Sequence, residues 1–454
     1  MSSLAGRHVV SIFDLTNEEV EGIFRLADRF HSGLQEAGAL AIGRRQRRGR
    51  PAKRSGGPAS LSRVCSDRVL ATLFFEPSTR TRLSFESAMH RLGGSVVTMA
   101  DARTSSAAKG ERLADTVRVV ASYADAIVLR HPHEGAALLA AESLDPQRLA
   151  ELGRLVPIIN GGDGSHEHPT QTLLDLYTIN RDHGRIAGLN VALCGDLLHA
   201  RTVHSLAYGL ARFGANLKCV SPASLRLPGY VKRRLEIEFG CVPAEYDSFR
   251  DFAAPDRQHV ISAADPLDRR SSYAAGKRRR GRIGPLLRDD ELLEAVSSLV
   301  DAVYVTRIQK ERFREPAQAE AVRASYLVDD KMLAAIGKHA TIMHPLPRVD
   351  EVDYVVDTDT RAAYFRQASY GVPIRMALIA LLLGRRRLGR PKGAAASAVQ
   401  SARRPAAEFV SGVRCENATC ITNHEPGLAA RMEVISELGV LRCAYCEQEQ
   451  EAQR

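Results

Sequence analysis

The sequence lacks the features that mark a membrane-spanning or secreted chain. Its longest purely apolar run, MALIALLL at 376–383, is far shorter than the roughly 20 residues that a transmembrane helix needs. The stretch MSSLAGRHVVSIFDL at 1–15 does not combine a charged start, an apolar segment and a small-residue cleavage site. We therefore expect a cytoplasmic protein without a membrane partner.

Two motifs of nucleotide-binding proteins are also missing. Neither a G-x-G-x-x-G fingerprint nor a G-x-x-x-x-G-K-S/T phosphate loop occurs in the sequence. The glycine-rich stretch GGDGS at 161–165 is interpreted as a tight turn without phosphate chemistry of its own.

The excess of positive charge is concentrated in three short tracts. The net charge is +10, but the tracts at 44–54, 277–282 and 385–392 carry more positive charge than that, so the rest of the chain is mildly acidic. Each tract is rich in Arg, Gly or Pro and lacks apolar periodicity, which favours solvated insertions or linkers. Contacts with a polyanion are the alternative, but a nucleic-acid partner is not expected.

Strand-like and helix-like segments alternate along most of the chain, which at 454 residues is too long for one ordinary core. Thr16, followed three residues later by Glu19, predicts a capped helix, and 371–384 predicts a final apolar helix. The alternation predicts an α/β fold with two doubly wound parallel-sheet domains joined by helices. The predicted division is a first domain at 1–160 with a basic insertion at about 43–63, a second domain at 161–388 with a basic insertion at about 254–288, a linker at 389–407, and a small β-rich cysteine module at 408–454.

The stretch FFEPSTRTR at 74–82 predicts an anion site. A strand ends near Phe75 and a helix begins near Ser78, so the unpaired N–H groups of the first helical turn can face a ligand. Hydroxyls and the arginines Arg80 and Arg82 add donors and charge, which together suit a phosphate. An ordinary Ser/Thr helix cap with surface arginines explains the bare pattern equally well.

The S-T-R-T-R motif after a strand is similar to the carbamoyl-phosphate signature of the aspartate and ornithine carbamoyltransferases. Three further motifs follow in the family's order, namely HPHEG with Arg130 before it, HPTQ at 168–171 and HPLPR at 344–348. On these four motifs, spread over roughly residues 5–388, the chain is identified as a member of that family. The resemblance implies transfer of a carbamoyl group from carbamoyl phosphate to an amino acid.

The acceptor side of the sequence resembles the aspartate enzymes. Ornithine enzymes typically carry a cysteine where Pro345 stands here. Aspartate brings two carboxylates, and planar guanidinium groups suit them. The sequence offers Arg201, and Arg307 with Gln309, at positions that resemble the aspartate-binding ones. The resemblance thus implies an aspartate carbamoyltransferase activity that yields N-carbamoyl-L-aspartate and phosphate, an early step of de novo pyrimidine (UMP) biosynthesis.

The resemblance also assigns roles to individual residues. Ser78, Thr79, Arg80 and Thr81 are expected to hold the phosphate. Thr81, Arg130 and His168 are expected to polarise the carbonyl oxygen, and Gln171 to contact the carbamoyl amino group. Four residues are expected to bind aspartate, namely Arg201, Arg307, Gln309 and Lys109. The backbone of Pro345 and Leu346 is expected to line the carbamoyl-phosphate site.

The loop TSSAAKG at 104–110 implies a shared active site. In the family, the residues matching Ser105 and Lys109 reach into the neighbouring subunit's site, which implies an obligatory homotrimer and allows a higher assembly of trimers. Ala108 stands where close relatives can have a second lysine. Taken without the motif, Lys109 is a surface lysine.

The expected chemistry needs no cofactor. An amine attacking a carbamoyl carbon requires a polarised carbonyl and a stabilised phosphate leaving group, which fixed donors supply. The sequence offers no convincing covalent nucleophile or catalytic metal site. His168 could act as a base, but a histidine that donates a hydrogen bond to the carbonyl must keep its N–H. We therefore favour the role of hydrogen-bond donor for His168. The departing phosphate is a plausible acceptor of the amine proton.

Four of the eight cysteines crowd the C-terminal module. Two close thiol pairs far apart in sequence predict a tetrahedral structural Zn²⁺ site, with disulfides as the alternative, and metal binding would supply folding free energy to so small a module. The predicted ligands are Cys415, Cys420, Cys443 and Cys446. CENATCITNHEP and LRCAYCE also resemble the zinc domain of the regulatory chain of bacterial aspartate carbamoyltransferase, whose nucleotide-binding domain has no counterpart here.

Two other functions are compatible with parts of the sequence. One is a carbamoyltransferase that uses ornithine or another amino-acid acceptor. The other is an inactive homologue that serves as a scaffold or nucleic-acid binder through its arginine tracts and zinc module. Every residue expected to act in catalysis is present, which favours the active aspartate enzyme.

Overall fold

The computed structural model describes residues 3–41, 61–101, 103, 106–144, 153–248, 300–307, 326–389, 408–410, 412–435 and 438–452. The chain forms two compact units, one of Met1–Arg185, Ala200–Phe213 and Phe365–Arg454 and one of Ile186–His199 and Gly214–Tyr364. The predicted insertion at 254–288, the basic tracts 44–54 and 277–282, and positions 390–407 of the linker lie outside the described residues.

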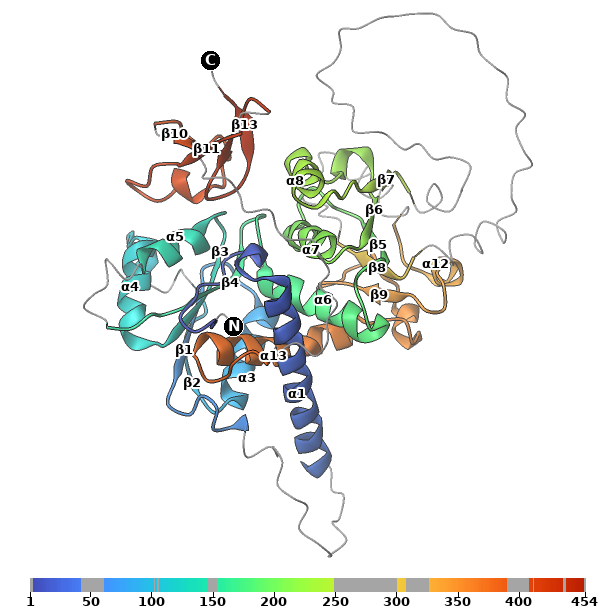
Figure 1. Ribbon diagram of the computed structural model, residues 1–454, viewed down its shortest axis with the longest axis horizontal. Helices are drawn as coiled ribbons and strands as arrows, with labels where there is room; N and C mark the ends of the chain where they lie inside the picture. Colours follow the sequence, from blue (N-terminus) through green and yellow to red (C-terminus); the bar gives the residue numbers. More distant parts are fainter. Residues whose placement is uncertain are drawn as a thin grey trace, which may run out of the picture. The chain divides into compact units, whose positions relative to one another are not determined.

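The first unit contains a parallel sheet with the strand order β2-β1-β3-β4 (Figure 1). Its inner strands are mostly apolar and are buried at every position except Val69, as expected for a sheet covered on both faces. The strands are β1 (Val69–Phe74), β2 (Ser95–Met99), β3 (Ala126–His131) and β4 (Ile158–Asp163). The described helices of this unit are α1 (Asn17–Ala41), α3 (Thr79–Arg91), α4 (Leu113–Tyr123), α5 (Ala136–Ser143), α6 (Pro169–His183), α7 (Arg201–Arg212) and α13 (Tyr364–Leu382), with short 3-10 turns at Ile12–Asp14 and Ser106–Lys109.

The second unit contains a parallel five-stranded sheet with the order β7-β6-β5-β8-β9. Its strands are β5 (Asn190–Cys194), β6 (Asn216–Val220), β7 (Ala244–Tyr246), β8 (Ala302–Val305) and β9 (Thr341–Met343). The described helices of this unit are α8 (Gly229–Phe239) and α12 (Asp330–Ala335), with 3-10 turns at Ala223–Leu225 and Tyr354–Thr358. The carboxyl ends of its parallel strands meet at one edge, where α/β proteins place their ligands.

The C-terminal module, which belongs to the first unit, is a small antiparallel sheet with the order β10-β11-β12-β13. Its strands are β10 (Phe409–Val410), β11 (Met432–Ile435), β12 (Val440–Cys443) and β13 (Glu449–Glu451), and a 3-10 turn spans Ile421–Asn423. The two parallel sheets and this β-rich module confirm the predicted fold class.

Of the two predicted helix features, the capping box is confirmed and the start of the final helix is wrong. The capping box is confirmed, because Glu19 N donates to Thr16 Oγ1 at 3.2 Å and Thr16 N to Glu19 Oε2 at 2.9 Å. The final helix begins at Tyr364 rather than near 371 and contains Pro373. Glycine and proline lower helix propensity, but burial of the apolar residues that follow Pro373 outweighs that cost.

The interpretation of GGDGS as a tight turn is wrong for its first half. Gly161–Asp163 continue strand β4, and all three positions are buried. The strand keeps pairing because Asp163 lies opposite His131 of β3 across a register shift.

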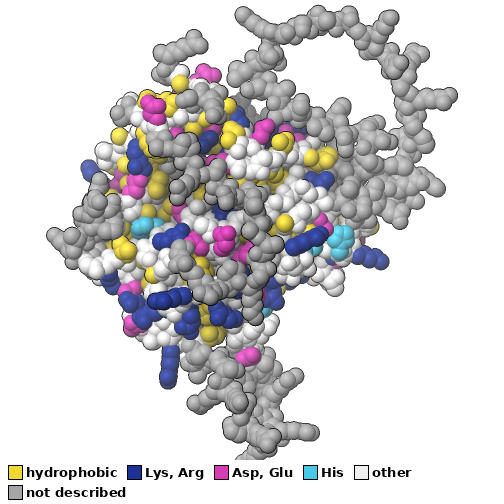
Figure 2. Space-filling model, viewed as in Figure 1, with side chains coloured by type: hydrophobic (Ala, Val, Ile, Leu, Met, Phe, Trp, Pro, Cys, Tyr) yellow, Lys and Arg dark blue, Asp and Glu magenta, His cyan; other side chains and the backbone are white. Residues whose placement is uncertain are grey.

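Two surface properties concern the partners of the chain. No described helix is both long and apolar enough to cross a membrane. On the face in Figure 2, basic and acidic side chains are interspersed over the described surface.

Candidate active site and metal centre

The predicted phosphate cradle forms the N-terminus of α3. Ser78 occupies the N-cap position, but its hydroxyl makes no capping hydrogen bond. The first helical bond runs from Arg82 N to Ser78 O at 3.2 Å, so the N–H groups of residues 79–81 have no helical acceptor. This arrangement differs from an ordinary Ser/Thr cap and leaves hydroxyl and backbone donors available to an anion.

The charge of this helix start also favours an anion. A helix N-terminus is stabilised by negative charge, yet the first turn of α3 contains no acidic residue and includes Arg80. Arg80 is exposed and has no carboxylate partner among the described residues. A bound phosphate would supply the missing negative charge.

Glu76, which sequence reasoning did not single out, joins two of the predicted arginines. Its carboxylate accepts from Arg130 Nη2 at 2.9 Å and from Arg201 Nη1 and Nη2 at 3.1 and 2.8 Å. Burial would raise the pKa of Glu76, but hydrogen bonds and charge from Arg201 and Arg130 hold it below its ordinary value. The two arginines are therefore fixed as a cationic pair around one carboxylate.

The guanidinium of Arg130 lies against the backbone of β4. Arg130 Nη1 donates to Gly161 O at 3.0 Å. Gly162 has a φ of 114°, and a Cβ at this position would lie 2.6 Å from Arg130 Nη1. Only glycine fits both the backbone conformation and the space. The glycine stretch, which was expected to be only a tight turn, therefore helps to position Arg130.

His168 is the N-cap residue of α6 and is only 4% exposed. Its backbone N–H donates to Ser205 Oγ at 3.2 Å, but neither ring nitrogen has a partner among the described residues. Burial and then the charges of Arg130, Arg375 and Arg201 lower the pKa of His168 well below its ordinary value. The ring is thus neutral and has one N–H to offer to a ligand.

Arg375 of α13 is a second residue that sequence reasoning missed. It is 3% exposed, donates to Ser84 Oγ at 2.8 Å, and lies over the ring of Phe85 at 4.8 Å. Burial lowers its pKa to about 10. The signal in the sequence was an isolated arginine within an apolar helix, which is costly unless the charge is used.

Gln171 and Lys109 complete the described candidates of the first unit. Gln171 lies in the first turn of α6 and donates through Nε2 to Asp175 Oδ1 at 2.9 Å. Lys109 is exposed and ends a 3-10 turn. Ser105 lies outside the described residues.

The second unit carries the remaining described candidates. Arg307 follows strand β8 and is half-buried, whereas Gln309 lies outside the described residues. Pro345 and Leu346 follow β9, and Leu346 N donates to His344 Nδ1 at 2.8 Å. Leu346 has a φ of 55°, a left-handed conformation that non-glycine residues rarely adopt and that is concentrated at functional sites.

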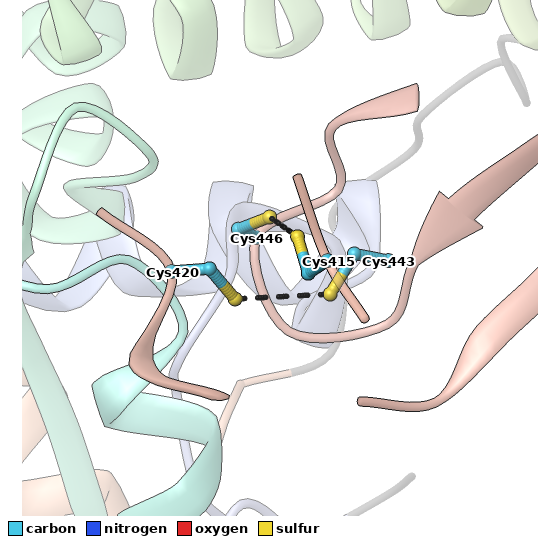
Figure 3. A group of neighbouring side chains, drawn as sticks. All are labelled: Cys415, Cys420, Cys443 and Cys446. Atoms are coloured by element: carbon cyan, nitrogen blue, oxygen red, sulfur yellow. Dashed lines mark hydrogen bonds between the residues drawn. The ribbon is translucent and has the colours of Figure 1, made fainter. Parts of the chain in front are cut away.

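The four cysteines of the module converge on one point, as Figure 3 shows. All four are buried, and their Sγ atoms lie within 4.8 Å of one another. Sγ of Cys415 lies 3.6 Å from that of Cys446, and Sγ of Cys420 lies 3.8 Å from that of Cys443. A zinc ion bound by four thiolates places its sulfurs about 3.8 Å apart. The geometry therefore fits a tetrahedral metal, and the disulfide alternative does not hold, since all four cysteines are free.

Three family models match the chain. Residues 7–181 match the carbamoyl-P binding domain of aspartate/ornithine carbamoyltransferase, and residues 276–382 match its Asp/Orn binding domain. Residues 408–454 match the metal binding domain of the aspartate carbamoyltransferase regulatory chain.

Curated relatives and solved structures agree with these matches. The aspartate carbamoyltransferase catalytic subunit of Thermoplasma volcanium is 42% identical over 84% of this chain and 99% of its own length, and that of Methanopyrus kandleri is 43% identical over 85% and 99%. The catalytic subunit of M. jannaschii aspartate transcarbamoylase has a TM-score of 0.61 at 41% identity, covering 83% of this chain and 98% of that one. Aspartate transcarbamoylase from Trypanosoma cruzi in complex with N-(phosphonacetyl)-L-aspartic acid has a TM-score of 0.63 at 31% identity, covering 84% and 98%.

Proposed function

The chain belongs to the aspartate/ornithine carbamoyltransferase family, and we propose that it transfers the carbamoyl group of carbamoyl phosphate to the amino group of L-aspartate. The products are N-carbamoyl-L-aspartate and phosphate, and the reaction serves de novo pyrimidine (UMP) biosynthesis. The relatives reported above are all aspartate enzymes, which supports aspartate rather than ornithine as the acceptor.

The observation that carries the proposal is the N-terminus of α3. An uncapped helix start with a cationic first turn and no acid favours the binding of an anion, which supports the proposal. We propose that Ser78, Thr79, Arg80 and Thr81 bind the phosphate of carbamoyl phosphate there. The proposed binding domain for this substrate is 1–160, and the proposed aspartate-binding domain is 161–388.

In the proposed reaction, Thr81, Arg130 and His168 donate to the carbonyl oxygen of the carbamoyl group. The neutral amine of aspartate attacks the carbonyl carbon, a C–N bond forms, and negative charge collects on that oxygen. The C–O bond to phosphate then breaks, and its electron pair leaves with the phosphate, which takes up the amine proton. Donors fixed in advance around a developing oxyanion can each lower the barrier by about 3–4 kcal/mol.

The neutral imidazole of His168 supports a donor role over a base. Its low pKa means that the ring is uncharged near neutral pH, so it offers one N–H and polarises the carbonyl without adding another positive charge beside the arginines. Gln171 is proposed to contact the carbamoyl amino group. Arg201, Arg307, Gln309 and Lys109 are proposed to bind the two carboxylates of aspartate, with Pro345 and Leu346 lining the site.

We also propose a homotrimer with shared active sites, which can associate further into assemblies of trimers. Lys109 is exposed, as expected if it serves a site completed by another chain together with Ser105. Strand β2 is an edge strand whose Val97 is 45% exposed, and a partner chain would cover such an edge. We further propose a cytoplasmic location.

For the module we propose structural Zn²⁺ bound by Cys415, Cys420, Cys443 and Cys446. The ion would supply folding free energy to a sheet of short strands with little core of its own. No step of the transfer reaction involves it.

Parallel assays with aspartate and ornithine as acceptors test the function. We expect N-carbamoyl-L-aspartate and phosphate to form in equal amounts from carbamoyl phosphate and aspartate, without added cofactor. Product formation with ornithine alone would refute the acceptor, and no transfer to either amino acid would refute the activity.

A further inference from the structure

Two segments, one directly after Arg130 and one that ends at His168, are hydrogen-bonded to each other. Segment 131–135 continues β3 beyond Arg130, and segment 163–168 leads from β4 to His168. Gly164 N donates to His131 O at 3.0 Å, and Gly135 N donates to Asp163 Oδ2 at 2.9 Å. Displacement of either segment would therefore move the other.

Glu134, in the first of these segments, binds the metal module through its backbone. Its N–H donates to Thr419 O at 3.0 Å, and its carbonyl accepts from Ile421 N at 2.9 Å. Cys420, one of the four clustered cysteines, lies between these two residues and forms an isolated β-bridge with Glu134. The backbone of Glu134 is thus fixed to both neighbours of a proposed metal ligand.

The carboxylate of Glu134 makes further hydrogen bonds, both to the metal module and to the segment that leads to His168. It is 3% exposed and accepts from Asn417 Nδ2 at 2.7 Å and from Thr419 Oγ1 at 3.1 Å. It also accepts from Ser165 N, in the segment that leads to His168, at 3.4 Å. One buried side chain therefore links the module to both active-site segments.

Close packing surrounds this link. The rings of His133 and His424 stack with centroids 3.6 Å apart and an interplanar angle of 7°. Gly135 approaches the module so closely that a Cβ would lie 2.6 Å from Tyr445 Cβ. The buried residues of the module belong to the same hydrophobic cluster as those of β3 and α5. Contacts of this density transmit displacement rather than absorb it.

From these contacts we infer that metal binding to the four cysteines positions Arg130 and His168 of the same chain through Glu134. The inference rests on the proposed function, which gives Arg130 and His168 their roles, and it makes Glu134 a positioning residue. Metal removal frees the loop around Cys420, because the module depends on the ion for its fold. Glu134 then loses its partners, and a buried carboxylate without partners favours rearrangement of both segments.

Hydrogen exchange of the full chain tests the inference independently of turnover. We compare zinc-loaded protein with protein treated with a chelator under reducing conditions, in the wild type and in Glu134→Ala. Chelation of the wild type should raise exchange in segments 131–135 and 163–168 and weaken binding of N-(phosphonacetyl)-L-aspartate, each roughly tenfold. Glu134→Ala removes the carboxylate contacts but keeps the two backbone bonds to the module, so it should show part of both losses with zinc bound. Chelation should then bring the variant only to the level of the chelated wild type.

A control and a second variant distinguish the positioning effect of Glu134 from general destabilisation of the protein. Glu142 of α5 also contacts the module, with Tyr445 Oη 3.1 Å from its Oε2 and a hydrogen bond from Arg431, so Glu142→Ala should keep the metal dependence. If Glu134→Ala does not fold, Thr419→Val removes one donor to Glu134 and should lose part of the coupling.

Either of two results would overturn the inference. One is unchanged exchange in both segments when the wild type loses its metal, and the other is additive loss in the chelated Glu134→Ala protein. Metal-dependent exchange in a protein without transferase activity would instead refute the proposed function and leave the coupling intact.

Discussion

Arg201 binds Glu76 through both of its terminal nitrogens, at 3.1 and 2.8 Å. The same carboxylate accepts from Arg130 at 2.9 Å. Burial, followed by the positive charge of Arg201, lowers the pKa of Arg130 to about 10, and Glu76 opposes that shift. Two guanidinium groups proposed to bind different substrates are therefore held in place by one anion.

Glu76→Gln should impair catalysis more than folding. Glutamine keeps the shape of the side chain but removes the charge that holds the two arginines, and small misplacements of such groups cost roughly 100-fold in rate. Steady-state kinetics should show kcat/KM lower by about that factor. Glu21→Gln, which removes an exposed partner of Arg25 on α1, is the matched control and should leave the kinetics unchanged.

Arg80→Ala should abolish turnover with little effect on stability. The side chain is exposed at the helix start and has no carboxylate partner among the described residues, so its removal should change unfolding by no more than about 0.5 kcal/mol. Loss of the proposed phosphate contact should lower kcat/KM by about 100- to 1,000-fold or more. Arg91→Ala, an exposed change at the other end of α3, should remain active; near-normal turnover of Arg80→Ala would contradict the cradle.

The parts of the site that could be predicted from sequence are those whose chemistry is local. The anion site at α3 needs only a strand end, a turn and the next helical turn, all within residues 74–82. The four cysteines are likewise recognisable from their spacing, since thiol pairs of this kind have few other uses in a small module. The structure has the helix start near Ser78 and the cluster of four cysteines at the predicted positions, and anion binding at the helix start stays a prediction.

The residues that were not predicted from the sequence have roles that arise from contacts between distant parts of the chain. Glu76 lies inside a predicted motif, but its partners are 54 and 125 positions away, and a lone carboxylate in a turn usually faces solvent. Gly162 is required because of Arg130, which lies on a different strand. The final helix was predicted too short because local propensity gave no weight to the burial of its apolar side chains.

Mixing two inactive variants tests the shared site. If Lys109 acts in a neighbouring subunit's site, then a trimer that contains both Lys109→Ala and Arg80→Ala chains includes sites in which both residues are native. Denaturing and refolding the two variants together should therefore restore activity that neither has alone. Refolding each variant separately is the control, and mixtures as inactive as the separate variants would contradict a shared site.

Cys443→Ser should remove the metal and destabilise the module. Three thiolates and a hydroxyl make a poorer site for a soft-ligand metal, and the module depends on the ion for folding. Elemental analysis should find close to one zinc per wild-type chain and much less in the variant. Cys241→Ser changes a half-buried thiol of the second unit, so it should keep the metal; full zinc content in Cys443→Ser would contradict the assignment.

The buried imidazole of His168 should make stability depend on pH in a defined direction. Its pKa in the folded chain is far below that of an unfolded histidine, first through burial and then through the charges of Arg130, Arg375 and Arg201. Above pH of about 6.5 the ring is neutral in both states and costs nothing. Below that pH, His168 takes up a proton in the unfolded chain but stays neutral in the folded chain. The free energy of unfolding therefore falls as the pH falls.

His168→Gln removes that proton uptake and should flatten the dependence. Denaturant unfolding between pH 7.5 and 5 should show a smaller loss of unfolding free energy in the variant than in the wild type, whatever the variant's stability at pH 7.5. Other buried histidines, such as His131, contribute to the slope in both proteins and cancel in the difference. His90→Gln, on the exposed face of α3, is the control and should keep the wild-type slope. Equal slopes for wild type and His168→Gln would mean that the ring is accessible to protons, which would remove the argument for a neutral donor.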